Sequence, residues 1–436
     1  MGQIRSAYAG VAGILLRMPV PPISARDLET RTADVGPFVE RELARTQGLL
    51  RLAPCWVPRA FVQPGRRLKL HPDDIYAFGL ERGGIDERWF ASTVEAANLG
   101  RVPDEGLSYV VAGRERATLR DAVEECGASL VGDRLWTRYR RWPVFAKFFD
   151  NRGAIPHHMH QDAAQAALVG REAKPEGYYF PPQLNASGNV FPFTFFGLAP
   201  GTTRADVRRC LERWHTGDNG ILDLAQASRL EVGTGWLIPP RMLHAPGSLC
   251  TYEPQWASDV LAMYQSVVDG QPIPWDLLVQ DVPRAHHDDL DYLVDQLDWA
   301  ANLDPTFREA HLLRPRQAST GVGFVDRWVV YGRIDGADLF SAKELTVEPG
   351  ATCTITDAGA WGLVCVQGVG TINGEPLASP TLIRFGGLTD DEYFCSEAGA
   401  RKGVTFANTS RTEPLVTLRY FGPGGEDGGL EEGRLR

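Results

Sequence analysis

The segment PHHMH, residues 156–160, holds three of the nine histidines of this chain. On an extended strand, side chains alternate between the two faces, so His158 and His160 are expected on one face and His157 on the other. Two imidazoles that lie roughly 7 Å apart on one strand face can both reach one metal ion. The same pattern is also typical of an ordinary polar strand face, so a metal site needs further ligands from elsewhere in the chain.

Two later segments supply such ligands. Glu176 opens the aromatic strand EGYYF, and His244 follows a Pro-Pro turn that ends the apolar strand WLI. Three histidines and one carboxylate suit Zn²⁺, Mn²⁺ or Fe²⁺ and leave coordination positions open for water or substrate. The candidate metal ligands are His158, His160, Glu176 and His244.

The elements that must position these residues are mostly short strands. From about residue 54, strand-like segments alternate with Gly- and Pro-rich turns, and three helices are predicted at 118–130, 202–215 and 286–302. Thr202 or Thr203 is the expected N-cap of the second helix. These patterns predict a mainly β fold.

The chain after Gly321 reads almost entirely as strand and turn. Asn373-Gly374 is a two-residue hairpin signal between alternating segments. Several short strands at this spacing indicate a sandwich or a small barrel. No histidine follows His311, so a second metal site of the same kind is not expected in this part of the chain.

Composition excludes several classes of partner. The chain has 45 Lys and Arg against 55 Asp and Glu, a formal net charge of -10, and no extended basic stripe, which argues against nucleic acid and anionic membrane surfaces. The seven cysteines contain no CxxC pair, as is typical of reduced thiols in a cytoplasmic protein. No apolar run approaches the roughly 20 residues that a membrane-spanning helix needs.

Five stretches resemble, in the same order, the motifs of one known family. They are WPVFAKFFDNRGAIPHHMHQD, similar to a strand leading into Q-x-H-P-D; AKPEGYYF, similar to a K-P-E strand; FFGLAPGTTRADVRRCLE, similar to an L-x-P-G-T-T helix; GWLIPPRMLHAPGS, similar to F-I-P-x-G-T-x-H-A-I; and LCTYEPQWASDV, similar to E-x-x-x-x-S-D. Over roughly residues 54–423 the chain therefore resembles type I mannose-6-phosphate isomerase, a family of the cupin superfamily.

The resemblance implies roles for individual residues. It repeats the same four metal ligands, with His158 where the family has glutamine, and implies zinc as the leading choice of metal. It places Lys174 at the rim of the metal site and makes Lys174 and Glu253 candidates for proton transfer. Met263 stands where the family has an arginine. Arg241, three residues before His244, is the candidate replacement for that cation.

The resemblance also implies the fold class: mainly β, with two cupin (jelly-roll β-barrel) domains and inserted and linking α-helices. The predicted divisions are an N-terminal extension at 1–48, a metal-binding cupin domain with helical insertions at 49–282, a helical linker at 283–318, a second cupin domain without metal ligands at 319–423, and a disordered tail at 424–436.

The expected function is a metal-dependent aldose–ketose isomerase that acts on a sugar or sugar phosphate through an enediolate. Two alternatives stay open. One is an Fe²⁺-dependent cupin dioxygenase, because the same ligands suit oxygen-activating iron. The other is a catalytically silent carbohydrate-binding cupin, which the replacement of the arginine by Met263 favours. The expected partners are a small sugar and a second copy of the chain in a homodimer.

Overall fold

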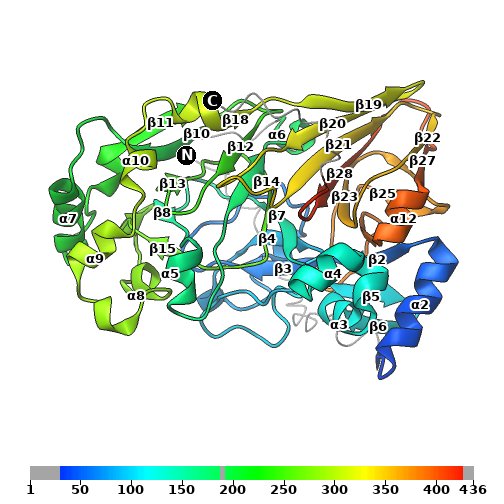
Figure 1. Cartoon of the computed structure of the whole chain (residues 1–436), viewed down its shortest axis with the longest axis horizontal. Helices are drawn as coiled ribbons and strands as arrows, with labels where there is room; N and C mark the ends of the chain where they lie inside the picture. Colours follow the sequence, from blue (N-terminus) through cyan, green and yellow to red (C-terminus); the bar gives the residue numbers. More distant parts are fainter. Residues whose placement is uncertain (1–29, 187–191, 426–436) are drawn as a thin grey trace, which may run out of the picture.

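The protein is mainly β, with 33% of residues in strands and 23% in helices. The computed structural model describes residues 30–186 and 192–425, and Figure 1 shows how their elements are arranged. Most of the tail predicted to be disordered, 426–436, and residues 1–29 of the predicted extension lie outside the described residues. The mainly β prediction is confirmed, while the division into two cupin domains stays a prediction.

Two sheets form the half of the molecule that carries the candidate metal ligands. The first has seven strands, in the order β18 (Leu312–Leu313), β12 (Gly235–Ile238), β9 (Glu176–Tyr179), β14 (Thr251–Trp256), β7 (Val144–Phe149), β4 (Ile85–Phe90) and β3 (Cys55–Pro58). The second has five, in the order β11 (Ala225–Arg229), β10 (Phe193–Leu198), β13 (His244–Ala245), β8 (His158–Met159) and β15 (Ala262–Met263).

The central strands of the seven-stranded sheet are buried on both faces. All six residues of β7 and all six of β14 are buried, and the two strands pair in antiparallel register from Thr251 opposite Phe149 to Trp256 opposite Val144. Within these apolar strands, Lys147 lies directly opposite Glu253. A buried charge is costly unless an opposite charge lies beside it. This cross-strand pair places the two opposite charges side by side in the protein interior.

Two other sheets form the second half. One has ten strands, in the order β1 (Thr30–Arg31), β6 (Glu115–Thr118), β5 (Tyr109–Ala112), β2 (Leu49–Ala53), β26 (Glu392–Cys395), β23 (Trp361–Gln367), β28 (Leu415–Phe421), β21 (Ser341–Val347), β20 (Phe324–Val330) and β19 (Arg316–Gly321). The other has four, in the order β22 (Thr352–Ile355), β27 (Val404–Asn408), β24 (Val369–Ile372) and β25 (Glu375–Ala378). A separate ribbon pairs β16 (Val267–Val268) with β17 (Gln271–Pro272).

Strand β2 joins distant parts of the sequence. Its residues Leu49 and Leu50 pair with Cys395 and Phe394 of β26. Residues 49–53 therefore lie in the ten-stranded sheet, although the predicted metal-binding domain at 49–282 includes them. The predicted hairpin at Asn373-Gly374 is confirmed between β24 and β25, and both of its residues have positive φ.

The helices are α2 (Val35–Thr46), α3 (Leu119–Val131), α4 (Asp133–Tyr139), α5 (Ala163–Ala167), α6 (Pro182–Asn185), α7 (Arg204–Glu212), α8 (Asp276–Val279), α9 (Leu290–Asp295), α10 (Trp299–Asn302), α11 (Phe307–His311) and α12 (Glu397–Lys402). The predicted helices at 118–130 and 202–215 are confirmed as α3 and α7. Thr203 caps α7 in a reciprocal capping box with Asp206.

The single helix predicted over 286–302 is wrong. The structure has α9 and α10 in that range, because Asp289 and Asp298 each begin a new helix. The Asp289 carboxylate accepts from the Tyr292 backbone N–H, and the Asp298 carboxylate accepts from the N–H groups of Ala300 and Ala301. An aspartate that accepts in this way is an N-cap, so the chain starts a new helix there rather than continuing the old one.

Buried ion pairs connect the two halves. Arg88 in β4 donates to both carboxylate oxygens of Asp391, at 2.8 Å each, and to Glu392 in β26 at 3.2 Å. Two carboxylates therefore share one guanidinium. Burial raises the pKa of Glu392 to about 8, because it outweighs the charge of Arg88, which lowers this pKa, and the smaller effect of Asp391 raises it further.

Replacing Glu392 with glutamine should flatten the pH dependence of stability. An unfolded glutamate titrates near 4.5, whereas this one titrates near 8, so between these values the folded protein holds a proton that the unfolded chain has released. Wild-type stability should therefore fall as pH rises, by at most about 1.4 kcal/mol per pH unit. Chemical denaturation across this pH window measures the slope. The control is Asp390→Asn, which changes a nearby, half-buried carboxylate that pairs with Arg51. A slope in Glu392→Gln equal to that of the wild type would contradict this assignment.

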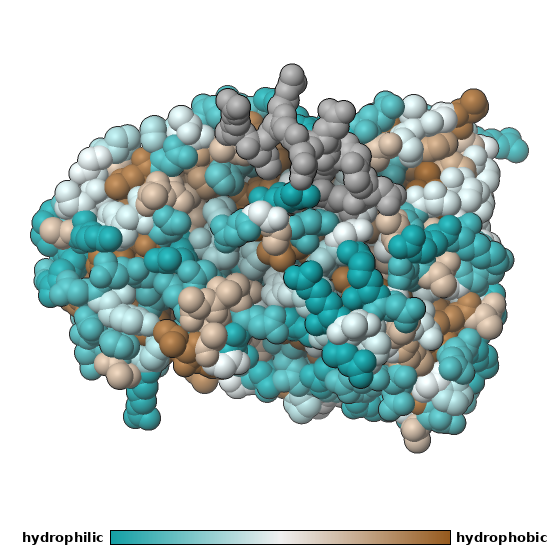
Figure 2. All heavy atoms as spheres, viewed as in Figure 1, coloured by the Kyte–Doolittle hydropathy of each residue, from teal (hydrophilic) through white to brown (hydrophobic). Residues whose placement is uncertain are grey.

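The surface seen in Figure 2 is mixed, with brown apolar residues scattered among teal hydrophilic ones. Leu99 and Val322 are among the exposed apolar side chains. No helix within residues 30–186 and 192–425 has the length and apolar character needed to cross a membrane. The cytoplasmic location and the homodimer stay predictions.

Candidate metal centre

A row of facing side chains crosses the five-stranded sheet. Phe196 in β10 lies opposite His244 in β13, His244 lies opposite His158 in β8, and His158 lies opposite Met263 in β15. Residues directly opposite each other on paired strands project from the same face. The register therefore places His244 beside His158, with 4.1 Å between their ring centroids.

His160 and Glu176 complete the cluster. The ligand nitrogens of His158, His160 and His244 all lie within 4.8 Å of one another. Glu176, from the seven-stranded sheet, reaches this group with both carboxylate oxygens: Oε2 lies 3.0 Å from His160 Nε2, and Oε1 lies 3.0 Å from His244 Nε2. The structure thus brings together all four candidate ligands, and each is at most 4% exposed.

The three rings are oriented by backbone carbonyl groups. The Nδ1 atoms of His158, His160 and His244 lie 2.7, 2.7 and 2.8 Å from the carbonyl oxygens of Pro156, Val260 and Met242, respectively. Since a carbonyl oxygen can only accept, each Nδ1 carries the proton, and each neutral ring keeps its lone pair on Nε2. Orientation of this kind by an outer hydrogen bond is the usual support for a metal-binding histidine.

The donor set fits a divalent cation. His244 Nε2 and Glu176 Oε1 are both acceptors, yet they face each other across 3.0 Å in the protein interior. His244 Nε2 has no hydrogen-bond partner, and Glu176 Oε1 receives one hydrogen bond, from Tyr178 Oη at 2.5 Å. Two buried acceptors at this distance call for a positive charge between them. Imidazole nitrogens with one carboxylate suit Zn²⁺, Mn²⁺ or Fe²⁺.

The protonation states also favour metal binding. Burial, reinforced by the neighbouring histidines, holds the pKa of His158 well below its usual range, and burial with the charge of Lys174 lowers the pKa of His160 to about 4. Burial alone would raise the pKa of Glu176, but its neighbours, above all the charge of Lys174, hold that pKa well below its usual range. At neutral pH these residues are therefore neutral imidazoles and an ionised carboxylate, as metal ligands must be.

Lys174 and Glu253 lie against the ligands. Lys174 Nζ is 2.8 Å from Glu176 Oε2, 3.0 Å from His160 Nε2 and 3.5 Å from Glu253 Oε1. The sequence interpretation placed Lys174 at the rim of the metal site, and in the structure its ammonium contacts two candidate ligands, His160 and Glu176. Burial, and next the charge of Glu176, raise the pKa of Glu253 to about 8.

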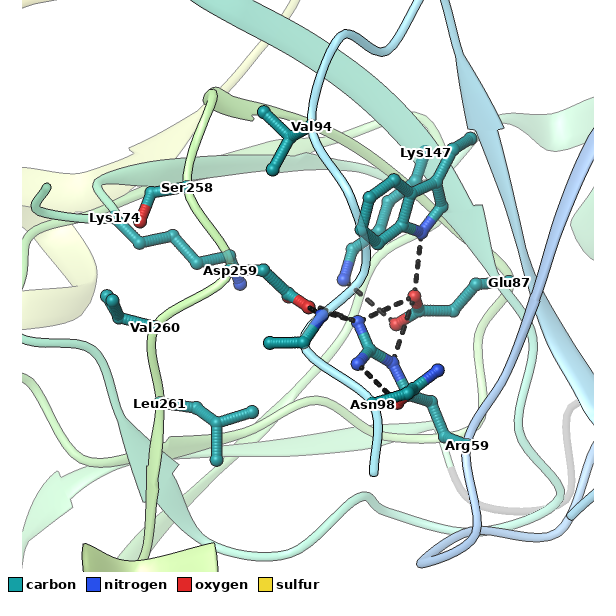
Figure 3. Close-up of polar contacts among 12 residues, drawn as sticks. Arg59, Glu87, Val94, Asn98, Lys147, Lys174, Ser258, Asp259, Val260 and Leu261 are labelled. Carbon is teal, nitrogen blue, oxygen red and sulfur yellow. Dashed lines mark hydrogen bonds and ion pairs between the residues drawn. The ribbon is translucent and has the colours of Figure 1, made fainter. Parts of the chain in front are cut away.

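A buried charge network that the sequence interpretation missed continues from this pair (Figure 3). Lys147 Nζ lies 3.4 Å from Glu253 and 2.9 Å from Glu87, and Glu87 accepts from Arg59, which also binds Asp259. Lys147 was detectable, because it is a charged residue inside the apolar strand FAKFF, whereas Glu87 stands between two other charged residues in DERWF. No local pattern singles out Arg59, which contacts Asp259 from 200 positions away.

Arg241 does not join Lys174 and Glu253. Its guanidinium donates to the carbonyl oxygens of Gln296, Asp295 and Leu297 at 2.8, 3.2 and 3.3 Å, and pairs with Asp162 at 3.3 Å. Three backbone acceptors hold this side chain against the region between α9 and α10, and its role as a replacement cation stays a prediction. Its backbone N–H, by contrast, donates to the His160 carbonyl at 2.7 Å.

Comparison with known proteins shows the fold. No family model and no curated protein matches the chain. Solved structures do match: a protein assigned as a mannosephosphate isomerase from Archaeoglobus fulgidus (TM-score 0.57, 12% identity, 86% of this chain and 97% of that one) and the mannose 6-phosphate isomerase of Bacillus subtilis (0.55, 16%, 86% and 100%). A zinc-bound mannose 6-phosphate isomerase matches similarly (0.55, 13%, 86% and 99%). At these identities the likeness establishes a shared fold.

Proposed function

We propose that this protein is a metal-dependent aldose–ketose isomerase that acts on a sugar or sugar phosphate. The observation that carries the proposal is the contact between a proton-transfer pair and the candidate ligands. Lys174 lies 3.5 Å from Glu253 and 2.8 Å from Glu176. The shared fold with mannose 6-phosphate isomerases supports the same activity.

The reaction moves two protons and needs no external oxidant. A base removes the proton from the carbon beside the carbonyl group, which gives an enediolate, and an acid returns a proton to the former carbonyl carbon. The second proton passes from the hydroxyl oxygen of the substrate to the former carbonyl oxygen. A divalent ion held by His158, His160, Glu176 and His244 would supply polarisation of the substrate oxygens, which lowers the cost of the enediolate. Glu253, whose pKa is about 8, can both accept and donate a proton near neutral pH.

Burial gives the site a second property. The candidate ligands, Lys174 and Glu253 are all at most 4% exposed, so bulk water is excluded and the enediolate would be protected from stray protonation. Under this proposal, substrate entry requires part of the covering chain to move, as is common for enzymes that close over their substrate.

A silent carbohydrate-binding protein is the second candidate. Met263 is 2% exposed and lies directly opposite His158, so an apolar side chain borders the candidate metal site. An arginine there could contact a phosphate group or a developing oxyanion, whereas a thioether cannot.

Metal analysis followed by a substrate panel tests the proposal. The purified protein, loaded in turn with Zn²⁺, Mn²⁺ and Fe²⁺, is incubated with aldoses and ketoses, each with and without a phosphate group, and the products and oxygen uptake are measured. We expect one metal per chain, interconversion of at least one aldose–ketose pair and no oxygen consumption. Oxygen uptake with Fe²⁺ would instead favour a dioxygenase, and sugar binding without turnover would favour the silent protein.

A further inference from the structure

The orientation of the His160 ring depends on a distant part of the chain, whereas the orientations of the other two histidine rings do not. His158 and His244 bond to carbonyl groups two residues before them, at Pro156 and Met242. His160 instead bonds to the carbonyl of Val260, 100 positions away, at 2.7 Å. The direction of the His160 ring is therefore only as well defined as the position of residue 260.

Residue 260 lies in a segment without regular secondary structure. Residues 258–261 lie within the connection from β14 to β15, which spans 257–261, and belong to neither strand. Side-chain contacts, rather than a ladder of strand hydrogen bonds, must hold this segment in place. Its ends are held by Gln255, whose side chain donates to the Ser258 carbonyl at 2.7 Å, and by Asp281, which accepts from the Leu261 N–H at 3.0 Å.

Arg59 holds the middle of the segment. Its Nη2 lies 3.1 Å from each carboxylate oxygen of Asp259, the residue next to Val260, and its side chain is only 3% exposed. Figure 3 shows this guanidinium between Asp259 on one side and Glu87 on the other, with Asn98 beside it. The Glu87 carboxylate accepts from Arg59 Nε at 3.2 Å, and the Asn98 carbonyl oxygen accepts from Nη1 at 3.0 Å.

The planar guanidinium is thus held by Glu87 and Asn98 as well as by Asp259. Charge-assisted hydrogen bonds of a buried arginine define direction as well as distance. The backbone N–H of Ala97 also donates to Asp259, at 2.8 Å, so the carboxylate is fully engaged. Any displacement of Asp259 must displace the adjoining Val260 carbonyl.

We propose that Arg59 is a positioning residue for the candidate metal centre: through Asp259 it fixes the Val260 carbonyl and thereby the ring of His160. The inference rests on the proposed metal-binding role of His160. The side chain of Arg59 bonds to Glu87, Asn98 and Asp259 rather than to any of the four candidate ligands, and it reaches His160 through the 258–261 segment. Its loss should disturb His160 and spare His158 and His244.

Two variants separate positioning from general stability. Arg59→Lys keeps the positive charge but loses the planar fork, and Asp259→Asn keeps the size of the side chain but loses the charge on it. The matched control is Arg419→Lys in β28, because Arg419 is also fully buried and donates to both oxygens of one aspartate, Asp326, at 2.8 and 2.7 Å. This pair lies in the ten-stranded sheet, away from the candidate ligands.

The first readout is the set of NMR signals of the histidine ring nitrogens. These signals are recorded on metal-free protein labelled with ¹⁵N-histidine. In Arg59→Lys and Asp259→Asn, we expect the Nδ1–H signal of His160 to shift or broaden while those of His158 and His244 stay in place. In Arg419→Lys all three should stay in place. Equal signals in all variants, or equal changes in all three rings, would overturn the proposal.

The second readout is Co²⁺ binding, since the visible spectrum of bound Co²⁺ reports its coordination geometry. We expect both variants to alter this spectrum and to weaken binding by about tenfold, the lower end of the effect of outer-shell changes. Wild-type affinity and spectrum in Arg59→Lys would overturn the proposal even if the protein binds metal. A wild-type protein that binds no Co²⁺ would remove the metal centre itself, and the histidine signals would still decide whether Arg59 orients His160.

Discussion

Glu176→Gln should lower the rate of sugar isomerisation by about 10³-fold and weaken metal binding. The substitution removes the negative charge of the donor set and turns one acceptor into an NH₂ group that faces a histidine lone pair. A bound ion contributes several kcal/mol of charge stabilisation in the transition state, and each 1.4 kcal/mol corresponds to a factor of ten. Steady-state turnover and metal content per chain, measured on the same preparation, check the result.

Glu344→Gln is the matched control for this change. Glu344 is also a buried glutamate that accepts a hydrogen bond from a tyrosine, Tyr179 Oη at 2.8 Å, and it lies in β21 of the other half. Both variants remove one buried carboxylate, but only Glu176→Gln should lose metal. If Glu176→Gln retained metal content and turnover, the candidate metal centre would be wrong.

Lys174→Met should have two effects of opposite sign. Turnover should fall by about 10²- to 10⁴-fold, the usual contribution of a positioned acid or base. Metal affinity should rise, because the Lys174 ammonium now donates to His160 Nε2 and Glu176 Oε2, the same lone pairs that an ion would use. Removal of a nearby positive charge also favours a cation electrostatically. Titration with Zn²⁺ in competition with a chelator, together with turnover, measures both effects.

Lys343→Met controls for the loss of a buried ammonium. Lys343 is 7% exposed and donates to Asp357 at 2.7 Å, away from the candidate ligands. It should lower stability without changing Zn²⁺ affinity. Full turnover in Lys174→Met would assign proton transfer to other groups, and weaker Zn²⁺ binding would show that Lys174 supports the ligands rather than competing with the ion.

Local patterns in the sequence predicted the parts of the site that depend on neighbouring residues. The alternation of His158 and His160, the strand that begins at Glu176, and the N-cap expected at Thr202 or Thr203 each depend on contacts within a few positions. The structure brings His158, His160 and Glu176 together with His244, as these patterns required.

Other features depend on contacts between distant segments and left no local signal. Arg241 lies near His160 in the backbone, but carbonyl groups near α10 capture its guanidinium. Arg59 reaches Asp259 across 200 positions, and no periodicity records that partnership. The pattern that suggested one helix over 286–302 has the correct apolar spacing, but the aspartates inside it favour helix starts over helix interiors.

The pairing of β2 with β26 has a consequence for biosynthesis. Ribosomes deliver residues 49–51 more than 340 residues before their hydrogen-bonding partners, residues 393–395. Until then the apolar ribbon LLRLA keeps one unsatisfied edge, which is a template for self-association. A nascent chain that is stalled or cleaved before residue 393 would therefore keep this strand edge unpaired, and we expect chaperones to bind it.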